Sequence, residues 1–309
     1  MAGFCNHVGY KQFTGRKSTP EEVEQLFTGL QKARLDDFQV MLSGYCPSAA
    51  LVEQVGKVAR SLKLKATMKP GSFFWILDPV MGDNGRIYVA EDTVPAYKSL
   101  LRDADLILPN QFEAELLSDI KIHDLATMQQ AITKLHRTYQ IPHVIITSIR
   151  LPPTTSNTPT DQDLATAAKI SIIGSTRTSD MQPRVFRITV PSFPIFFSGT
   201  GDMFAACMVA RLRQAAEQSE VLQQPSWRSP DEVSSTDLPL AKAAEKVLAS
   251  MHAVLKDTAE HYERTATQWQ EEDATSDDTV KHLRLTRAAE VRVVRNTRPC
   301  LIHPIWHQF

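Results

Sequence analysis

Short apolar runs that alternate with helical stretches are the strongest constraint on the fold of this chain of 309 residues. The apolar runs occupy residues 38–45, 73–79, 104–110 and 143–148. Segments with apolar residues at helical spacing separate them, at residues 48–64, 94–101, 111–118 and 125–139. Strands buried on both faces and separated by helices are typical of a parallel sheet. The pattern therefore predicts an α/β fold.

The alternation changes in the second half of the chain. Residues 168–175 and 184–191 are predicted strands joined by a polar link, which favours an antiparallel pair. Residues 201–215 and 238–258 are predicted helices, and residues 290–296 a late strand. We expect one α/β domain over residues 1–296, with a mostly parallel central sheet and an antiparallel addition.

Three polar segments and the end of the chain depart from this pattern. Residues 152–163, 219–238 and 265–281 are predicted on composition to be loops or disordered, because their apolar content is low. Residues 297–309, "TRPCLIHPIWHQF", form a tail that fits none of the predicted elements.

Composition excludes several classes of protein. The formal net charge of −1 argues against a nucleic-acid partner. The four cysteines, at positions 5, 46, 207 and 300, form no CxxC pair, which argues against a zinc ribbon or a disulfide scaffold. No apolar run approaches the roughly 18 residues of a membrane span, and the start carries no signal segment. We expect no membrane partner and a cytoplasmic protein, with the nucleus as a further compartment.

The segment "SGTGD" at residues 198–202 is the first candidate site. The N–H groups of Gly199, Thr200 and Gly201 can form a concave anion site at the start of a helix, strengthened by the helix dipole. A carboxylate beside an anion needs a reason, and Asp202 can be a general base that takes the proton of an attacking hydroxyl. The alternative is that Asp202 is an ordinary helix N-cap.

Two further candidates follow predicted strands. Asp78 ends the strand at 73–79 and precedes a loop with Gly82 and Gly85, which is either mobile over a site or a solvated turn. Asn110 and Glu113 begin a helix three residues apart, and can either hold Mg²⁺ through its waters or cap that helix.

Thr147 ends the strand at 143–148. It is either a hydroxyl contact to a phosphate or simply a β-branched strand residue. The usual GxxxxGK[ST], GxGxxG, HExxH and GxSxG motifs are absent from the sequence.

Taken together, the segments resemble the ribokinase-like superfamily, and within it the pyridoxal kinases. The lines that carry the resemblance are "FCNHVGY" (4–10), "LSGYCPSA" (42–49), "LDPVMGDNGRIYVAED" (77–92), "LPNQFEAELLS" (108–118), "VIITS" (144–148), "SGTGDMFAA" (198–206) and "ASMHAVLKDT" (249–258). The long polar insertions resemble those of fungal members. The resemblance implies a three-layer sandwich and ATP-dependent phosphorylation of the 5′-hydroxyl of pyridoxal, pyridoxine or pyridoxamine in vitamin B6 salvage.

The resemblance also implies roles for single residues. Asp202 would be the catalytic base, and Gly199, Thr200 and Gly201 the anion hole. Asp78, Asn110 and Glu113 would arrange Mg²⁺, or another divalent cation, and its waters. The nucleotide would lie near Asp105, Thr147, Ser175, Leu248 and Leu255. Val8 and Trp75 would contact the vitamin, with Trp75 stacked on its pyridine ring. A monovalent cation, K⁺ or Na⁺, and a homodimer are implied as well.

The start of the chain departs from the family pattern. The family begins with a strand and a helix that carry a Ser-His segment, and this sequence starts after them, so the domain is expected to be N-terminally incomplete. Val8 replaces the threonine of the family's "NHTGY". Two alternatives therefore stand beside a pyridoxal kinase. One is a non-catalytic or inactive truncated B6-binding protein, and the other is a related hydroxymethylpyrimidine or sugar kinase.

Overall fold

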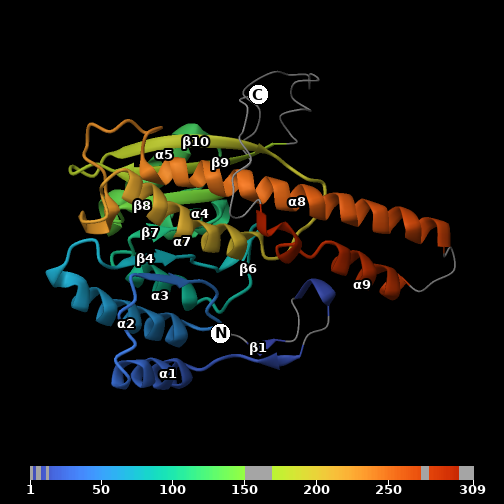
Figure 1. The fold of residues 1–309 in the computed structure, drawn as a ribbon, viewed down its shortest axis with the longest axis horizontal. Coiled ribbons are helices and arrows are strands. Elements are labelled where there is room, and N and C mark those ends of the chain that lie inside the picture. Colours follow the sequence, from blue (N-terminus) through green and yellow to red (C-terminus); the bar gives the residue numbers. More distant parts are fainter. Residues whose placement is uncertain (1–2, 5–7, 12–13, 150–168, 273–277, 299–309) are drawn as a thin grey trace.

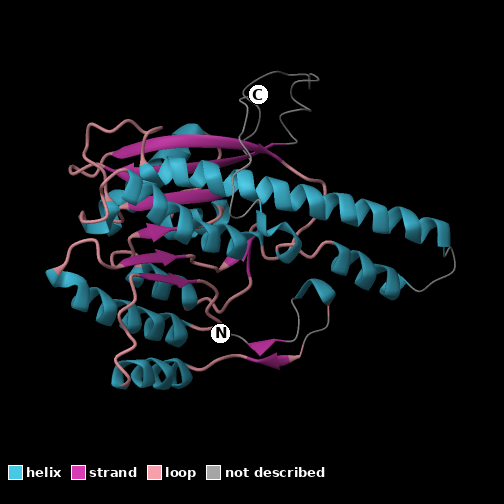
Figure 2. Cartoon of the chain, viewed as in Figure 1, coloured by secondary structure: helices cyan, strands magenta, loops and turns pink. Residues whose placement is uncertain are grey.

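A six-stranded sheet forms the centre of the protein (Figures 1 and 2). The computed structural model describes residues 3–4, 8–11, 14–149, 169–272 and 278–298. The strands of the sheet are β3 (Val40–Ser43), β4 (Phe74–Leu77), β7 (Leu106–Ile107), β8 (His143–Ile149), β9 (Lys169–Arg177) and β10 (Pro183–Pro191). Their order is β10-β9-β8-β7-β4-β3.

The sheet has the predicted mixture of directions. β3, β4, β7 and β8 are mutually parallel, whereas β9 is antiparallel to β8 and β10 to β9. The prediction of a mostly parallel sheet with an antiparallel addition is confirmed. Small antiparallel ribbons lie outside it, formed by β1 (Gly3–Phe4) with β2 (Gly15–Arg16) and by β5 (Gly82–Asp83) with β6 (Arg86–Ile87).

Helices cover both faces of the sheet. The helices of the described residues are α1 (Pro20–Lys32), α2 (Ala49–Lys65), α3 (Thr93–Leu100), α4 (Gln111–Ser118), α5 (Leu125–Tyr139), α7 (Thr200–Gln218), α8 (Pro239–Glu272) and α9 (Asp278–Ala288). Alternate residues of β4 point to opposite layers: Trp75 and Leu77 pack with α2, α3, α4 and α5, whereas Phe74 and Ile76 pack with α7 and α8. This is the three-layer arrangement predicted.

The late strand predicted at residues 290–296 is wrong. The segment ends in a 3-10 turn (Val294–Asn296), and Glu290 makes a single bridge to Ser198. Side chains of α8 hold this segment in place of a strand ladder. The N–H of Arg292 donates to Thr258 Oγ1 at 3.3 Å, and Asn296 Nδ2 donates to Asp257 Oδ2 at 2.8 Å.

The polar segment 219–238 is a loop, but an ordered one. It contains a 3-10 turn (Pro225–Trp227), and the Trp227 ring stacks on Phe74 with 4.2 Å between centroids. Trp227 Nε1 also donates to the carbonyl of Gly71 at 2.8 Å. One large aromatic ring therefore anchors a segment whose average composition is polar.

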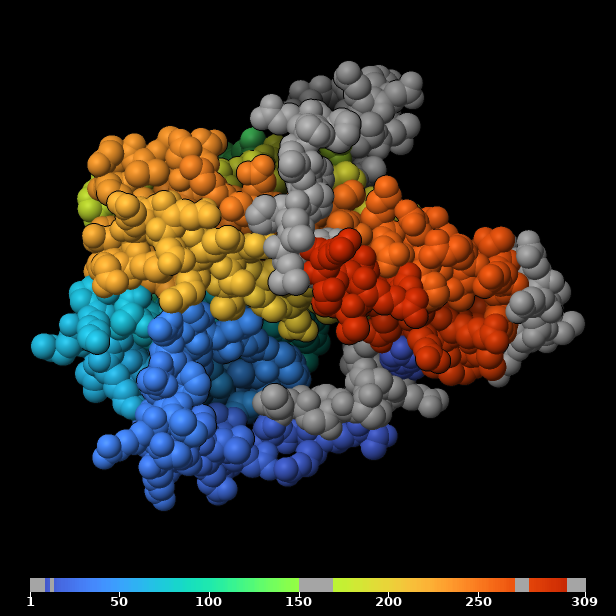
Figure 3. Space-filling view, viewed as in Figure 1, coloured from blue at the N-terminus to red at the C-terminus, as the bar shows by residue number. Residues whose placement is uncertain are grey.

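Part of the polar segment 265–281 is helical instead of being a loop. α8 continues to Glu272, and α9 begins at Asp278. The residues of α8 beyond Thr258 are rich in Glu, Ala and Gln, which favour helix. The end of α8 and α9 extend together beyond the sheet (Figures 1 and 3).

The predicted loop 152–163 and the C-terminal tail from residue 299 lie outside the described residues. Within the described part of the chain, no helix has both the length and the apolar character needed to cross a bilayer.

Candidate active site

The carboxyl ends of the parallel strands meet at one edge of the sheet, where most of the predicted site residues gather. Asp78 follows β4, and its N–H donates to the carbonyl of Ser43 at 2.8 Å. Asn110 follows β7 and forms a parallel bridge with Thr147 of β8. Ligands of open α/β sheets bind outside this edge.

The helix α7 begins at the same edge with an open N-terminus. Gly199 is its N-cap, with a φ of 80°, and no side chain caps it. The first helical bond runs from Met203 N to Gly199 O at 3.0 Å, so the N–H groups of Thr200, Gly201 and Asp202 precede the helical ladder. A Cβ placed on Gly199 or Gly201 would meet no atom within 4 Å. The helix therefore has room for an anion directly in front of it.

Asp202 is not the N-cap of this helix, because Gly199 holds that position. Asp202 lies in the first turn and is exposed to solvent. A carboxylate in the first turn lies near any ligand held at the helix start, and a general base requires such a position.

Asp78 lies in a cluster of carboxylates. Burial raises its pKa well above the usual range, and the charges of Glu113 and Asp202 raise it further. Among the described residues, no side chain of Lys, Arg or His forms an ion pair with Asp78. Three like charges near one another favour a bound cation that would neutralise them.

Asn110 and Glu113 cap the start of α4, which is one of the two roles that the sequence suggests for this pair. The Asn110 side chain accepts from the N–H of Glu113 at 2.9 Å, and the Glu113 carboxylate accepts from the N–H of Asn110 at 2.9 Å. Glu113 also accepts from the N–H groups of Met81 at 2.8 Å and Gly82 at 3.3 Å. Burial nevertheless raises the pKa of Glu113 to about 7.

These bonds fix the glycine loop as well as the helix. Asn110 Nδ2 donates to the carbonyl of Gly82 at 2.8 Å, so both ends of the Asn110 amide are engaged. Among the described residues, no group of three or more His, Cys, Asp and Glu side chains has the geometry to hold a metal ion by itself. A cation held by Asp78 would need phosphate oxygens and waters to complete its shell, as is usual for Mg²⁺.

A cleft of about 640 Å³ opens at this edge. Its polar end is formed by Asn110, Thr147, Thr200 and Gly201, and the glycine loop borders it with Asp83, Asn84 and Gly85. Its apolar end is formed by α8 with Leu248, Met251 and Leu255, together with Phe193 and Phe197. The cleft suits a ligand that has an anionic end and a flat, apolar end.

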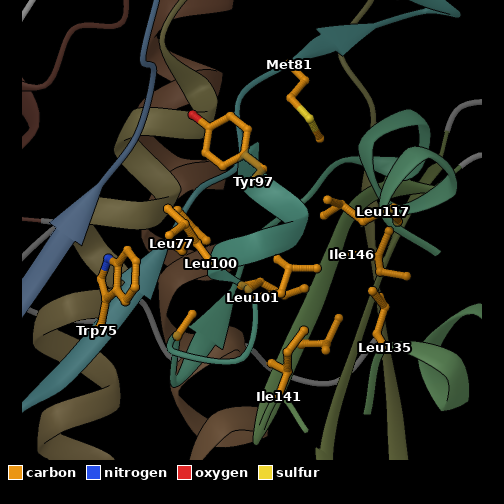
Figure 4. Packing of buried hydrophobic residues seen from close by; sticks show 14 of the residues in the cluster. Trp75, Leu77, Met81, Tyr97, Leu100, Leu101, Leu117, Leu135, Ile141 and Ile146 are labelled. Carbon is orange, nitrogen blue, oxygen red and sulfur yellow. The ribbon is translucent and has the colours of Figure 1, made fainter. Parts of the chain in front are cut away.

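Trp75 is placed differently from the prediction. It is fully buried in β4, and its Nε1 donates to Ser43 Oγ at 2.9 Å. Figure 4 shows its ring within the buried cluster that also holds Leu77 and Leu100. A ring that is enclosed in the core cannot stack on a ligand. The side chain of Val8 lies outside the described part of the protein.

Asp105 and Ser175 lie at the opposite edge of the sheet. Asp105 precedes β7, and Ser175 pairs with Val144 near the start of β8 because β9 runs antiparallel. Ser175 is fully buried and bonded to His136, and Asp105 is 1% exposed. The predicted nucleotide contacts at these two residues are therefore corrected to structural roles.

Two buried histidines lie at this opposite edge, and in each a carbonyl partner determines which ring nitrogen carries the proton. His136 Nδ1 donates to Ile141 O at 2.8 Å, and His143 Nε2 donates to Ser226 O at 2.7 Å. Burial lowers the pKa of His136 to about 4 and that of His143 to about 3.

Lowering the pH is expected to destabilise the protein through these two histidines. Between pH 6.5 and about 4, both rings become protonated in the unfolded chain but stay neutral in the folded chain. As the pH falls through this range, each histidine therefore lowers the free energy of unfolding by about 1.4 kcal/mol per pH unit. Urea unfolding at pH 7 and pH 5.5 measures this. The raised pKa of Glu113 acts in the opposite direction. The test is therefore the difference between the wild type and His136→Gln, whose stability should fall less. Equal losses in the two proteins would contradict the prediction.

Some residues at the cleft were not predicted. Phe193 lines it and packs on the His252 ring with 5.4 Å between centroids. The aromatic run 193–197, directly before "SGTGD", was the available signal. Tyr88 is a further residue near the carboxylates. Burial raises the pKa of its hydroxyl, and the negative charges of Glu113, Asp83 and Asp78 raise it further.

Comparisons with known proteins agree with this geometry. The sequence profile of the family described as phosphomethylpyrimidine kinase matches residues 37–225. A putative pyridoxal kinase of Schizosaccharomyces pombe is 32% identical over 255 residues, which cover 82% of this chain and 73% of that protein. The pyridoxal kinase of Homo sapiens is 32% identical over 217 residues, 67% of this chain and 64% of that protein. The pyridoxal kinase of Leishmania donovani in complex with ADP and pyridoxamine has the same fold, with a TM-score of 0.72, 24% identity, and coverage of 98% of this chain and 84% of that chain.

Proposed function

The chain belongs to the pyridoxal kinases of the phosphomethylpyrimidine kinase family, and from this membership we propose that it transfers the γ-phosphoryl group of ATP to the 5′-hydroxyl of a B6 vitamer. The observation that supports this best is the cleft. It combines the uncapped start of α7, lined by Thr200 and Gly201, with an apolar end on α8, and the exposed Asp202 directly follows Gly201 in the first turn of the helix. The activity is assigned to one domain, residues 1–296.

The proposed mechanism uses the residues of the sheet edge. The N–H groups of Gly199, Thr200 and Gly201 hold the negative charge of the phosphoryl group as it is transferred. Asp202 accepts the proton of the 5′-hydroxyl, which makes that oxygen a nucleophile. The apolar residues Leu248 and Leu255 hold the base of the nucleotide, and Thr147 contacts its phosphates.

Asp78 is the residue that we propose for binding a divalent cation, because the neighbouring charges of Glu113 and Asp202 favour a positive ion beside it. Asp78 would hold Mg²⁺, directly or through a water, while Asn110 and Glu113 keep the glycine loop and the helix start in place around it. When bound, Mg²⁺ would supply charge neutralisation at the phosphates. A monovalent cation, K⁺ or Na⁺, a homodimer and a cytoplasmic location belong to the proposal through the family resemblance.

A panel of acceptors tests the proposed substrate class. The purified chain is incubated with ATP and Mg²⁺, and ADP release is measured by a coupled assay with pyridoxal, pyridoxine, pyridoxamine, hydroxymethylpyrimidine and ribose. Pyridoxal or another B6 vitamer should have the highest kcat/KM. Hydroxymethylpyrimidine is the second candidate, because the matching family profile carries the name of that activity. A preference for it, or for ribose, would overturn the assignment to B6 vitamers. ADP binding without turnover on any acceptor would favour the non-catalytic alternative.

A further inference from the structure

A second concave site lies on α8 beyond the cleft, between that helix and the segment from Arg284 to Arg295. Figures 1 and 3 show α9 beside the end of α8. It has a volume of about 500 Å³. His261 and Thr265 of α8 form one side, and the chain from Arg284 to Arg295 forms the other. We call it the arginine pocket.

The arginine pocket carries an excess of positive charge. Its lining includes the four arginines Arg284, Arg287, Arg292 and Arg295. Its one lining carboxylate, Glu290, accepts a hydrogen bond from the Tyr10 hydroxyl at 2.9 Å. Arg284 and Arg287 lie three residues apart on α9, a spacing at which like charges on a helix repel each other. A fold gains nothing from this repulsion by itself.

The arginines are only partly neutralised by the protein. Arg292 pairs with Asp257 at 3.2 Å, and the Arg284 guanidinium lies 4.9 Å from the centre of the Trp269 ring. Arg287 and Arg295 form no ion pair with any carboxylate that the structure describes. Two guanidinium groups therefore border the pocket with their charge available to a ligand.

The ring of His261 lies in the positive potential of the same arginines. Burial lowers its pKa, and the charges of Arg292, Arg264 and Arg295 lower it further, against a smaller opposing effect of Asp257. A ring surrounded by cations on both α8 and the facing segment resists protonation. An anion in the pocket would reverse this.

We propose that the arginine pocket binds a small phosphate-bearing anion with at least two negative charges. The planar guanidinium group matches a phosphate with two parallel hydrogen bonds, so Arg287 and Arg295 can each grip one phosphoryl group. The volume is in the range of small-molecule sites. The site is distinct from the cleft: Leu255 of the cleft and His261 lie on the same helix, about 9 Å apart along its axis.

Pyrophosphate is the probe that tests this proposal, with His261 as the local reporter. The ring resonances of His261, assigned with a His261→Asn variant, are followed by NMR in a pH titration with and without pyrophosphate. Pyrophosphate should shift the His261 resonances with saturation and raise the pKa of the ring. Binding of pyrophosphate at the cleft would leave this ring unmoved, and the test does not depend on kinase activity.

Variants separate a built site from general attraction. In the double variant Arg287→Gln/Arg295→Gln the dissociation constant read at His261 should rise at least tenfold. If that protein does not fold, Arg295→Gln alone, on an exposed 3-10 turn, takes its place. The matched control Arg137→Gln removes an exposed arginine at the end of α5 and should leave binding unchanged. The proposal would be overturned if pyrophosphate left the His261 resonances unchanged, or if Arg137→Gln weakened binding as much as the double variant. It would also be overturned if citrate shifted these resonances as strongly as pyrophosphate.

Discussion

Replacing Asp202 with alanine is expected to lower kcat by roughly 10²- to 10⁴-fold, because the acceptor hydroxyl then loses its general base. ADP binding should persist, since the N–H groups at the start of α7 belong to the backbone and remain after the substitution. Stability should change little, because Asp202 is exposed and does not cap the helix. Steady-state ADP release, calorimetric titration of ADP and thermal unfolding of the same preparation measure the three quantities.

Asp202→Asn is the matched variant for this experiment. It keeps the size and polarity of the side chain but cannot accept the proton, so it should be as inactive as Asp202→Ala. Glu217→Ala, an exposed acidic residue near the other end of the same helix, should behave as wild type. An Asp202→Asn protein that keeps wild-type turnover would remove the proposed role and leave the aspartate as a surface residue.

The sheet could be predicted from the sequence because its strands are almost uninterrupted apolar runs. Residues that follow such a run, such as Asp78 and Asn110, necessarily lie at the carboxyl edge of a parallel strand. The same logic assigns Asp105 to the opposite edge, since it stands directly before β7. Its nucleotide role was inferred from family resemblance alone, and the order of the residues around the strand already argued against it.

Other placements depend on tertiary contacts that the sequence does not display. Ser175 follows an apolar run as Asp78 does, but β9 is reversed, so the end of this strand lies away from the cleft. Trp75 is one of four consecutive buried residues, and the pattern does not tell which face of the sheet it occupies. Trp227 is an isolated aromatic residue in a polar segment, and its burial depends on Phe74 and Gly71, which are distant in the sequence.

The two interpretations of Asn110 and Glu113 prove to be compatible in part. Their capping bonds are present, yet the same atoms hold Met81 and Gly82 in the loop beside the cleft. A motif that caps a helix can therefore also set the position of a loop near the reacting groups. Sequence spacing alone cannot distinguish these uses, because both place the side chains in the same position.

Asp105→Ala is expected to destabilise the protein strongly without changing the chemistry of the cleft. The buried carboxylate accepts from the N–H of Trp75 at 2.8 Å, from Ser226 Oγ at 2.7 Å and from Lys63 Nζ at 3.1 Å. Removing it leaves a buried N–H without a partner and releases the loop at Ser226, whose φ of 55° is unfavourable for a residue other than glycine. The free energy of unfolding, measured in urea, should fall by about 3 kcal/mol or more.

A neighbouring aspartate provides the control that separates a structural role from a nucleotide contact. Asp103 forms a surface ion pair with Arg60 at 2.7 Å, and Asp103→Ala should cost less than about 1 kcal/mol. Asp105→Asn, which keeps one acceptor oxygen, should be destabilised less than Asp105→Ala and should bind ADP as tightly as the wild type. If Asp105 is remote from the cleft, it can affect ADP binding only by changing the stability of the fold. Weaker ADP binding by Asp105→Asn at unchanged stability would therefore restore the nucleotide role.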